Sequence, residues 1–71
     1  MNEASRLRVL LPHWIAHNLA HADEFRRWAD RAGDAGPDIL AAAEALAQSS
    51  QHLRRALEKL GGDIGANMTA L

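Results

Sequence analysis

The sequence predicts an all-α protein, an antiparallel two-helix hairpin with a Pro-kinked or broken first helix, which dimerises into a four-helix bundle. Alanine, leucine, arginine and glutamate dominate the chain, and β-branched residues are few. No run alternates apolar and polar residues as a half-buried strand does. Two segments with helical apolar spacing flank one short stretch rich in glycine and proline. These observations favour two helices joined by a tight loop.

The first helix is expected to begin at a cap formed by Asn2 or Ser5 and to end near Ala32. Gly33 follows and supplies the left-handed residue at which helices commonly stop. At about 100° per residue, one side of this helix collects an apolar stripe with a single amide in it. Its members are Leu7, Leu11, Trp14, Ile15, Asn18, Ala22, Phe25 and Ala29.

Pro12 lies inside the first helical segment. Proline has no amide hydrogen, so it cannot donate the helical bond to the carbonyl of Arg8. Two outcomes follow from this. Either the helix kinks at Pro12, or a short first helix ends there and Pro12 opens the main one.

The stretch "GDAGPD" at 33–38 is the predicted helix-helix loop, and Pro37 suits the first turn of the second helix. That helix is expected to run from about Pro37 to Leu60 and to stop at Gly61 and Gly62. Its apolar stripe contains small residues, which permit close approach of a neighbouring helix. The stripe consists of Ile39, Ala43, Leu46, Ser50, Leu53, Leu57 and Leu60.

Two parts of the chain are distinguished: a hairpin domain at 1–62 and a flexible C-terminal tail at 63–71, which has no helical period. The chain has no cysteine and a net charge of −1, so neither a disulfide framework nor a nucleic-acid surface is expected. No segment reads as a secretory leader or a membrane span. We therefore expect a cytoplasmic protein without nucleic-acid or membrane partners.

A lone hairpin of this size leaves the outer parts of both stripes in water. Pairing two copies about a two-fold axis would bury them, which predicts a homodimer. Asn18 lies within the first stripe, where a buried amide needs a partner and can set the register of a helix pair.

His13, His17 and His21 follow one another at four-residue steps, so they form a row along one edge of the first helix. Glu24, three residues further on, extends this row. Two imidazoles at i and i+4 can chelate one ion, because neutral histidine offers a lone pair and the helix holds the two rings one turn apart. The row predicts a metal site that uses one adjacent pair together with Glu24, a water or a ligand from another helix.

Antiparallel folding about the loop brings position 17 level with about position 52, where the fourth histidine, His52, stands. His52 points away from the apolar stripe of its own helix, so a second chain is the better source of opposing ligands. The ions that suit such ligands are zinc, nickel and cobalt. The predicted metal ligands are His13, His17, His21, Glu24 and His52.

The same histidines have a plainer interpretation, in which they edge the core, shield Trp14 and Trp28, and form a pH-sensitive interface. Trp14 and Trp28 are themselves expected to be core packing residues, because they share helical spacing with Leu11 and Ile15. An enzyme is not expected. The row lacks the glutamate that follows the first histidine in zinc proteases, and it lacks the paired Glu-x-x-His repeats of di-iron proteins.

The segment "LLPHWIAHNLAHADEFRRWA" resembles short uncharacterised bacterial helical proteins with a Pro-His-Trp-x-x-His-Asn-x-x-His core. The resemblance covers about the first third of the chain and implies no function. Ala16 and Ala20 stand where that pattern has acidic residues, so only the histidines and Glu24 carry over.

Two functions are compatible with these sequence features. The first is a small helical-hairpin protein that binds a divalent transition metal through its histidine row for storage, delivery or sensing. The second is a metal-free homo-oligomeric interaction or regulatory module with histidines at its interface, which binds a larger protein partner.

Overall fold

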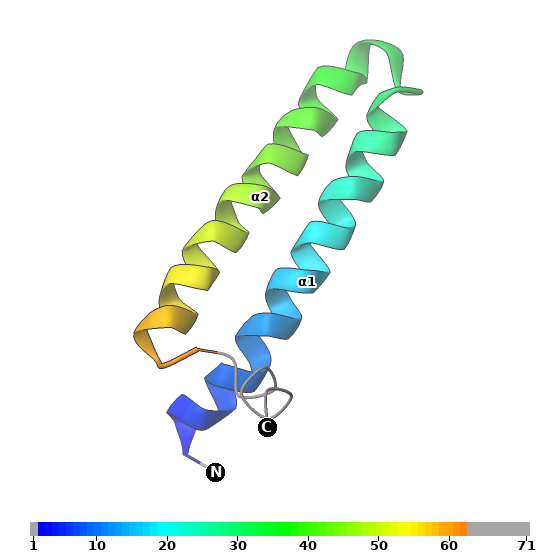
Figure 1. Cartoon of the computed structure of the whole chain (residues 1–71). Coiled ribbons are helices and arrows are strands. Elements are labelled where there is room, and N and C mark those ends of the chain that lie inside the picture. Colours follow the sequence, from blue (N-terminus) through cyan, green and yellow to red (C-terminus); the bar gives the residue numbers. More distant parts are fainter. Residues whose placement is uncertain (1, 63–71) are drawn as a thin grey trace.

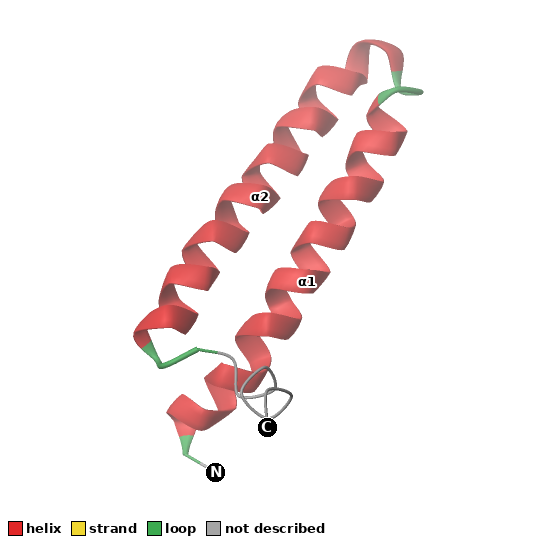
Figure 2. Ribbon diagram, in the orientation of Figure 1, coloured by secondary structure: helices red, strands yellow, loops and turns green. Residues whose placement is uncertain are grey.

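A computed structural model describes residues 2–62 of the chain, and these residues form two long helices side by side (Figure 1). Helix α1 spans Glu3–Ala29, the short 3-10 helix η1 spans Gly33–Ala35, and helix α2 spans Gly36–Lys59. The two long helices run antiparallel, and no strand occurs within the described range (Figure 2). The predicted all-α hairpin is confirmed. The expected flexible tail at 63–71 lies outside the described residues.

Helix α1 begins at the first of the two predicted caps. The Oδ1 atom of Asn2 accepts a hydrogen bond from the backbone N–H of Ser5 at 2.8 Å, which satisfies one of the unpaired amides of the first turn. The helix ends at Ala29, three residues before the predicted end near Ala32. The intervening residues continue as tighter turns, in which the N–H of Ala32 bonds the carbonyl of Ala29 at 3.2 Å.

Pro12 lies within α1, which is one helix from Glu3 to Ala29. A broken first helix, one of the two predicted outcomes, is therefore wrong. The proline removes a single backbone bond. Continuing the helix keeps Leu11 and Ile15, on both sides of it in the sequence, buried against α2, and this burial outweighs the loss.

The turn follows the sequence prediction closely. Gly33 adopts the left-handed conformation, with φ of 56°, and opens η1. Helix α2 then starts at Gly36, with Pro37 in its first turn, where the missing amide of proline costs no helical bond. Asp38 in the same turn faces the positive end of the helix dipole.

Helix α2 ends in a Schellman motif. The N–H of Gly62 bonds the carbonyl of Leu57 at 2.9 Å, and the N–H of Gly61 bonds the carbonyl of Glu58 at 3.1 Å. Gly61 has a φ of 104°, which a residue with a side chain rarely adopts. The predicted stop of the second helix at this glycine pair is confirmed.

The guanidinium of Arg8 ties the beginning of α1 to the end of α2. Its Nε atom donates to the carbonyl of Gly62 at 2.8 Å, and its Nη2 atom donates to that of Gly61 at 3.3 Å. Carbonyl groups at a helix C-terminus carry partial negative charge, so a cation suits this position. The contact closes the open end of the hairpin.

The core between α1 and α2 is narrow because small residues occupy much of it. Among the described hydrophobic residues that are fully buried, only Leu11 and Ile15 are larger than alanine. Near the turn the backbones approach closely, because a Cβ on Gly36 would lie 2.8 Å from the carbonyl oxygen of Ala29. Four leucines in and directly after α2 are half-buried. They are Leu46, Leu53, Leu57 and Leu60.

Trp14 and Trp28 do not belong to the core of the described hairpin, and their prediction as core aromatics is wrong. Trp14 is 41 % exposed and Trp28 is 58 % exposed. Each helix has a single neighbour in the described hairpin, so only the middle of its apolar stripe is covered. Both indoles project from the side of that stripe and remain largely in contact with solvent.

Candidate functional site

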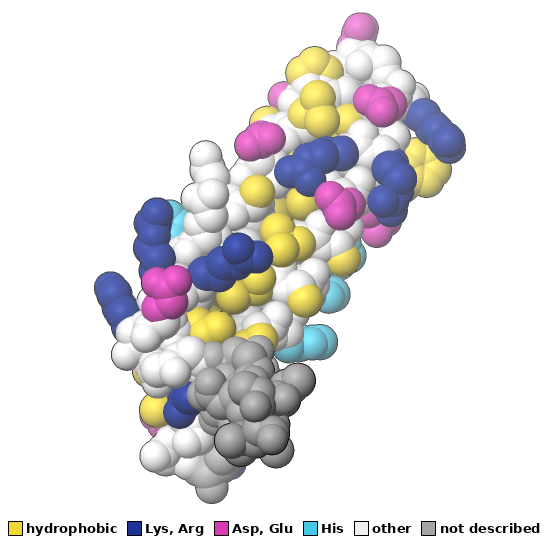
Figure 3. Space-filling model, viewed as in Figure 1, with side chains coloured by type: hydrophobic (Ala, Val, Ile, Leu, Met, Phe, Trp, Pro, Cys, Tyr) yellow, Lys and Arg dark blue, Asp and Glu magenta, His cyan; other side chains and the backbone are white. Residues whose placement is uncertain are grey.

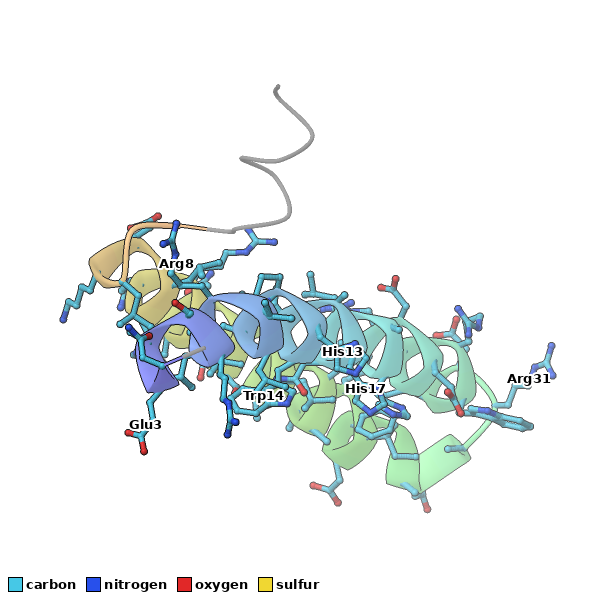
Figure 4. The ribbon with its side chains drawn as sticks, turned by 90° about the horizontal axis from the view of Figure 1, so that it is seen from below. Glu3, Arg8, His13, Trp14, His17 and Arg31 are labelled. Atoms are coloured by element: carbon cyan, nitrogen blue, oxygen red, sulfur yellow. The ribbon has the colours of Figure 1, made fainter. Side chains whose placement is uncertain are left out.

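The three histidines of the row lie exposed on α1. Figure 4 shows His17 and Trp14 extending from the side of α1 opposite to the Arg8 side chain. Continuous helix through this segment puts the three rings on successive turns, as predicted. The row is therefore accessible to a ligand along its whole length.

His17 and His21 form a close pair. Their Nε2 atoms are 3.0 Å apart, and the two rings meet edge to face with centroids 4.4 Å apart. This distance is a hydrogen bond in which one nitrogen donates and the other accepts. A tetrahedral zinc ion with bonds of 2.0 to 2.1 Å separates two nitrogen ligands by about 3.3 Å. The pair therefore needs a small ring movement to hold an ion, together with a shift of the donating ring to the tautomer that carries its proton on Nδ1.

His13 lies beside this pair without joining it. Its ring stacks over that of His17 at an interplanar angle of 26°, with centroids 6.2 Å apart. At this separation the two rings do not share a hydrogen bond. The row thus divides into one separate imidazole and one pair with converging nitrogens, which fits the expectation that an ion uses an adjacent pair.

Glu24 faces the other nitrogen of His21. Its Oε2 atom is 3.8 Å from Nδ1 of His21, and both side chains are about half-exposed. At this distance the two groups do not share a hydrogen bond. A rotation of the exposed Glu24 side chain would bring the carboxylate within reach of Nδ1, from where carboxylates orient metal-bound histidines. Glu24 thus stands on the far side of the ring from the convergence point of the pair.

His52 is exposed on α2, and the structure gives it no contact with the row. Histidine side chains show at both long edges of the molecule in Figure 3. Within residues 2–62, no group of three His, Cys, Asp or Glu side chains is arranged to hold a metal ion. One described chain therefore offers a two-nitrogen chelate, and further ligands have to come from water or another chain.

A family model described as "Domain of unknown function (DUF8180)" matches residues 7–60. The chain belongs to this family. The match covers most of both helices and includes all four histidines. It confirms the predicted resemblance to uncharacterised proteins, while the Pro-His-Trp pattern as a family feature stays a prediction. No curated protein and no solved structure matches the chain.

The middle of α1 in this DUF8180 domain carries no charged side chain. Residues 9–22 include no Asp, Glu, Lys or Arg, although the segment is one helix of a hairpin and much of its surface faces solvent. Leu10 is 41 % exposed, as is Trp14. Exposed apolar side chains gathered on one element are typical of interaction surfaces. The sequence analysis predicted an exposed stripe edge that includes Trp14, but it did not single out Leu10, and the uncharged segment is the signal that could have found this residue.

A shallow apolar hollow of about 440 Å³ continues this surface toward the turn. Phe25 and Trp28 of α1 form one wall, and Ile39 and Ala42 of α2 form the other. Asp38 is the charged residue on its rim. The guanidinium of Arg31 lies 5.8 Å from the centre of the Trp28 ring, where it makes a cation-π contact.

The face of the DUF8180 domain seen in Figure 3 is different in character. Basic and acidic side chains lie on both sides of its apolar stripe. On α1, Nη1 of Arg26 forms an ion pair with Oδ1 of Asp23 at 3.0 Å. Neither of the described helices contains an apolar stretch long enough to cross a membrane.

Proposed function

We propose that this chain binds a divalent transition metal ion through the Nε2 atoms of His17 and His21, as a small cytoplasmic protein of metal storage, delivery or sensing. The observation that carries the proposal is the 3.0 Å separation of these two atoms on one rigid helix. Neutral imidazole suits zinc, nickel and cobalt. When the ion binds, the ring that donates in the pair takes the tautomer with its proton on Nδ1, so that both Nε2 atoms offer lone pairs.

The remaining predicted ligands have distinct places in this proposal. Glu24 orients the ring of His21 through Nδ1. His13 lies one turn before the pair, where it can replace a water ligand after a side-chain rotation. His52 stands on α2 and would act only toward a neighbouring chain.

We also propose that the working unit is a homodimer that forms a four-helix bundle. The support is the narrow core, in which alanine supplies most of the fully buried hydrophobic positions, together with the exposed Trp14 and Trp28. Burial of large apolar side chains is the main favourable term in folding and association. A second hairpin provides that burial.

The metal proposal is tested by calorimetric titration of zinc and of nickel into metal-free protein. His17→Ala and His21→Ala each remove one ligand of the pair, and we expect at least a tenfold loss of affinity. His52→Ala is the matched control, since it removes an imidazole from the chain without touching the pair. No binding by the unaltered chain, or an equal loss with His52→Ala, would contradict the proposal.

A second function is favoured by a separate observation. The exposed indoles and the hollow beside Trp28 also suit a metal-free oligomeric interaction module that binds a larger protein partner. In that case a chelator leaves the self-association of the protein unchanged. Acidification alone then alters it, because protonation charges histidines that lie at the interface.

A further inference from the structure

We infer that His17 and His21 are half of a four-imidazole site, and that a second copy of this chain, packed antiparallel along α1, supplies the other half. This inference rests on the proposed metal binding. It specifies which surface joins the two copies, in which direction they run, and how the ion and the dimer depend on each other.

The site is incomplete in one copy. Residues 2–62 bring together no third His, Cys, Asp or Glu at the meeting point of the two Nε2 atoms. Structural zinc sites are closed by four protein ligands in a tetrahedron. A second histidine pair that approaches from the exposed side of α1 would provide the two that are absent.

The exposed side of α1 is arranged symmetrically along the helix. Leu10 and Trp28 are each nine residues from Leu19, and His17 and His21 are each two residues from it. A two-fold axis perpendicular to α1 at this level therefore places Leu10 opposite the partner's Trp28 and His17 opposite the partner's His21. An isologous interface requires such self-complementarity.

Trp14 and Phe25 are also related by this two-fold axis, to within one residue. Trp14 is five residues before the level of the axis and Phe25 is six residues after it, so the indole of one copy lies against the phenyl ring of the other. Trp14 and Leu10 are each 41 % exposed, and Phe25 lines the hollow beside Trp28. The antiparallel arrangement thus covers the large exposed side chains of this surface with one another.

The charge distribution favours this side of the hairpin over the opposite one. Residues 16–22 of the two copies lie opposite one another around the axis and include no charged residue, so the centre of the interface leaves no carboxylate or ammonium group buried without a partner. Residues 9–15 of each copy face residues 23–29 of the other, where Asp23 and Arg26 already form an ion pair. The opposite face carries basic and acidic side chains over both helices (Figure 3). Burying those groups would require their desolvation.

A parallel dimer is disfavoured by the side chains that it would bring together. It would place Trp28 against the partner's Trp28 and would bring the Arg27 and Arg31 ends of the two copies together. Like charges side by side oppose association. In the antiparallel dimer each bulky indole meets a smaller side chain, and the two helix dipoles oppose each other.

Metal binding and dimerisation are then coupled. An ion held by four imidazoles binds the dimer more tightly than the monomer, and by linkage the ion raises the dimerisation constant by the same factor. The metal-loaded protein is expected at one ion per two chains. The metal-free protein is expected to dissociate at concentrations where the loaded protein stays dimeric.

Analytical ultracentrifugation of the full chain, with zinc or with a chelator, tests the coupling. We expect at least a tenfold rise in the dimerisation constant with zinc, and a loss of that rise in His17→Ala. Trp28→Glu is expected to weaken the dimer strongly. Leu40→Glu is its matched control, because Leu40 is 44 % exposed on α2 outside the proposed surface.

The outcomes separate the inference from the proposed function. Zinc bound at one ion per chain by a protein that stays monomeric would leave metal binding intact and overturn the inference. A dimerisation constant that zinc does not change would also overturn it. No zinc binding at all would remove the proposed function together with the inference.

The direction of packing is tested by site-directed spin labelling. Because the chain has no cysteine, one introduced cysteine is the single site of labelling. A nitroxide spin label attached to Arg27→Cys, at an exposed position outside the proposed pairings, reports the distance between the two copies in the zinc-loaded dimer. Arg27 is eight residues from Leu19, so in the antiparallel arrangement the labels are separated by about 24 Å along the helices, at 1.5 Å per residue. Labels close together, near the roughly 10 Å spacing of neighbouring helices, would overturn the antiparallel arrangement. Circular dichroism confirms that each variant keeps its helices.

Discussion

The carbonyl oxygen of Ala29 lies 2.8 Å from the point at which a Cβ on Gly36 would stand. The obstacle is backbone, which cannot rotate away as a side chain would. Gly36→Ala is therefore expected to push the two helices apart at the turn and to destabilise the hairpin by about 1 to 3 kcal/mol. The measurement is the midpoint of thermal unfolding followed by circular dichroism.

The control for this prediction is Ala41→Gly, at an exposed position of α2. There the exchange costs about 1 kcal/mol because alanine is the better helix former. Gly36→Ala moves in the direction of higher helix propensity and should still destabilise. A raised unfolding midpoint for Gly36→Ala would show that the approach of Ala29 to Gly36 is not a close one.

Arg8 is expected to stabilise the hairpin through its contact with the glycine pair that follows α2. Its Nε atom donates to the carbonyl of Gly62 at 2.8 Å from a partly buried position. Hydrogen bonds of charged groups contribute about 1.5 to 3 kcal/mol, so Arg8→Ala should lower the free energy of unfolding by an amount in this range. Chemical denaturation measures it. Arg6→Ala, which removes an exposed arginine of the same helix, should change stability far less, and equal effects would contradict the role of the contact.

Ser50 presents the opposite case, because its removal should stabilise the protein. The side chain is 2 % exposed, and its Oγ atom has no hydrogen-bond partner among the described residues. An unpaired buried hydroxyl costs about 1 to 3 kcal/mol, and alanine is also the better helix former. Ser50→Ala should therefore raise the denaturation midpoint more than Ser49→Ala, which alters the exposed neighbour. A decrease for Ser50→Ala would indicate that the hydroxyl is paired in solution.

Glu24→Gln tests the orienting role of the carboxylate. The variant keeps the shape of the side chain and removes the charge beside Nδ1 of His21. Loss of such an outer partner typically weakens metal binding by about 10- to 100-fold. Asp23→Asn is the matched control, since Asp23 pairs with Arg26 instead. Zinc titrations of the two variants should differ, and identical affinities would remove Glu24 from the site.

The helix boundaries were largely predictable because local chemistry determines them. Gly33 and Gly61 adopt backbone conformations that other residues avoid, and Pro37 fits a first helical turn. The outcome at Pro12 was not settled by such local signals. Whether a proline breaks a helix depends on how much apolar surface stays buried when the helix continues through it. That area is set by the packing of the two helices and cannot be read from the residues around the proline.

Of the candidate site, only the four-residue spacing of its histidines was predictable from the sequence. Four-residue steps place His13, His17 and His21 on one edge, but side-chain rotation decides that the last two meet through Nε2 while the first stacks at a distance. The exposure of Trp14 was missed for a related reason. A helical wheel shows which side a residue is on, and the number of neighbouring helices decides whether that side is covered.

The zinc-bound state should be lost on acidification, in a way that identifies its ligands. Zinc needs neutral imidazoles, so protons compete with it for the Nε2 lone pairs of His17 and His21. The rise in unfolding temperature caused by excess zinc should be large at about pH 8 and should disappear by about pH 5, below the ordinary range of histidine titration. His13→Ala should retain this rise at about pH 8, whereas His17→Ala and His21→Ala should lack it throughout. A rise that persists at about pH 5 would mean that groups other than these two imidazoles hold the ion.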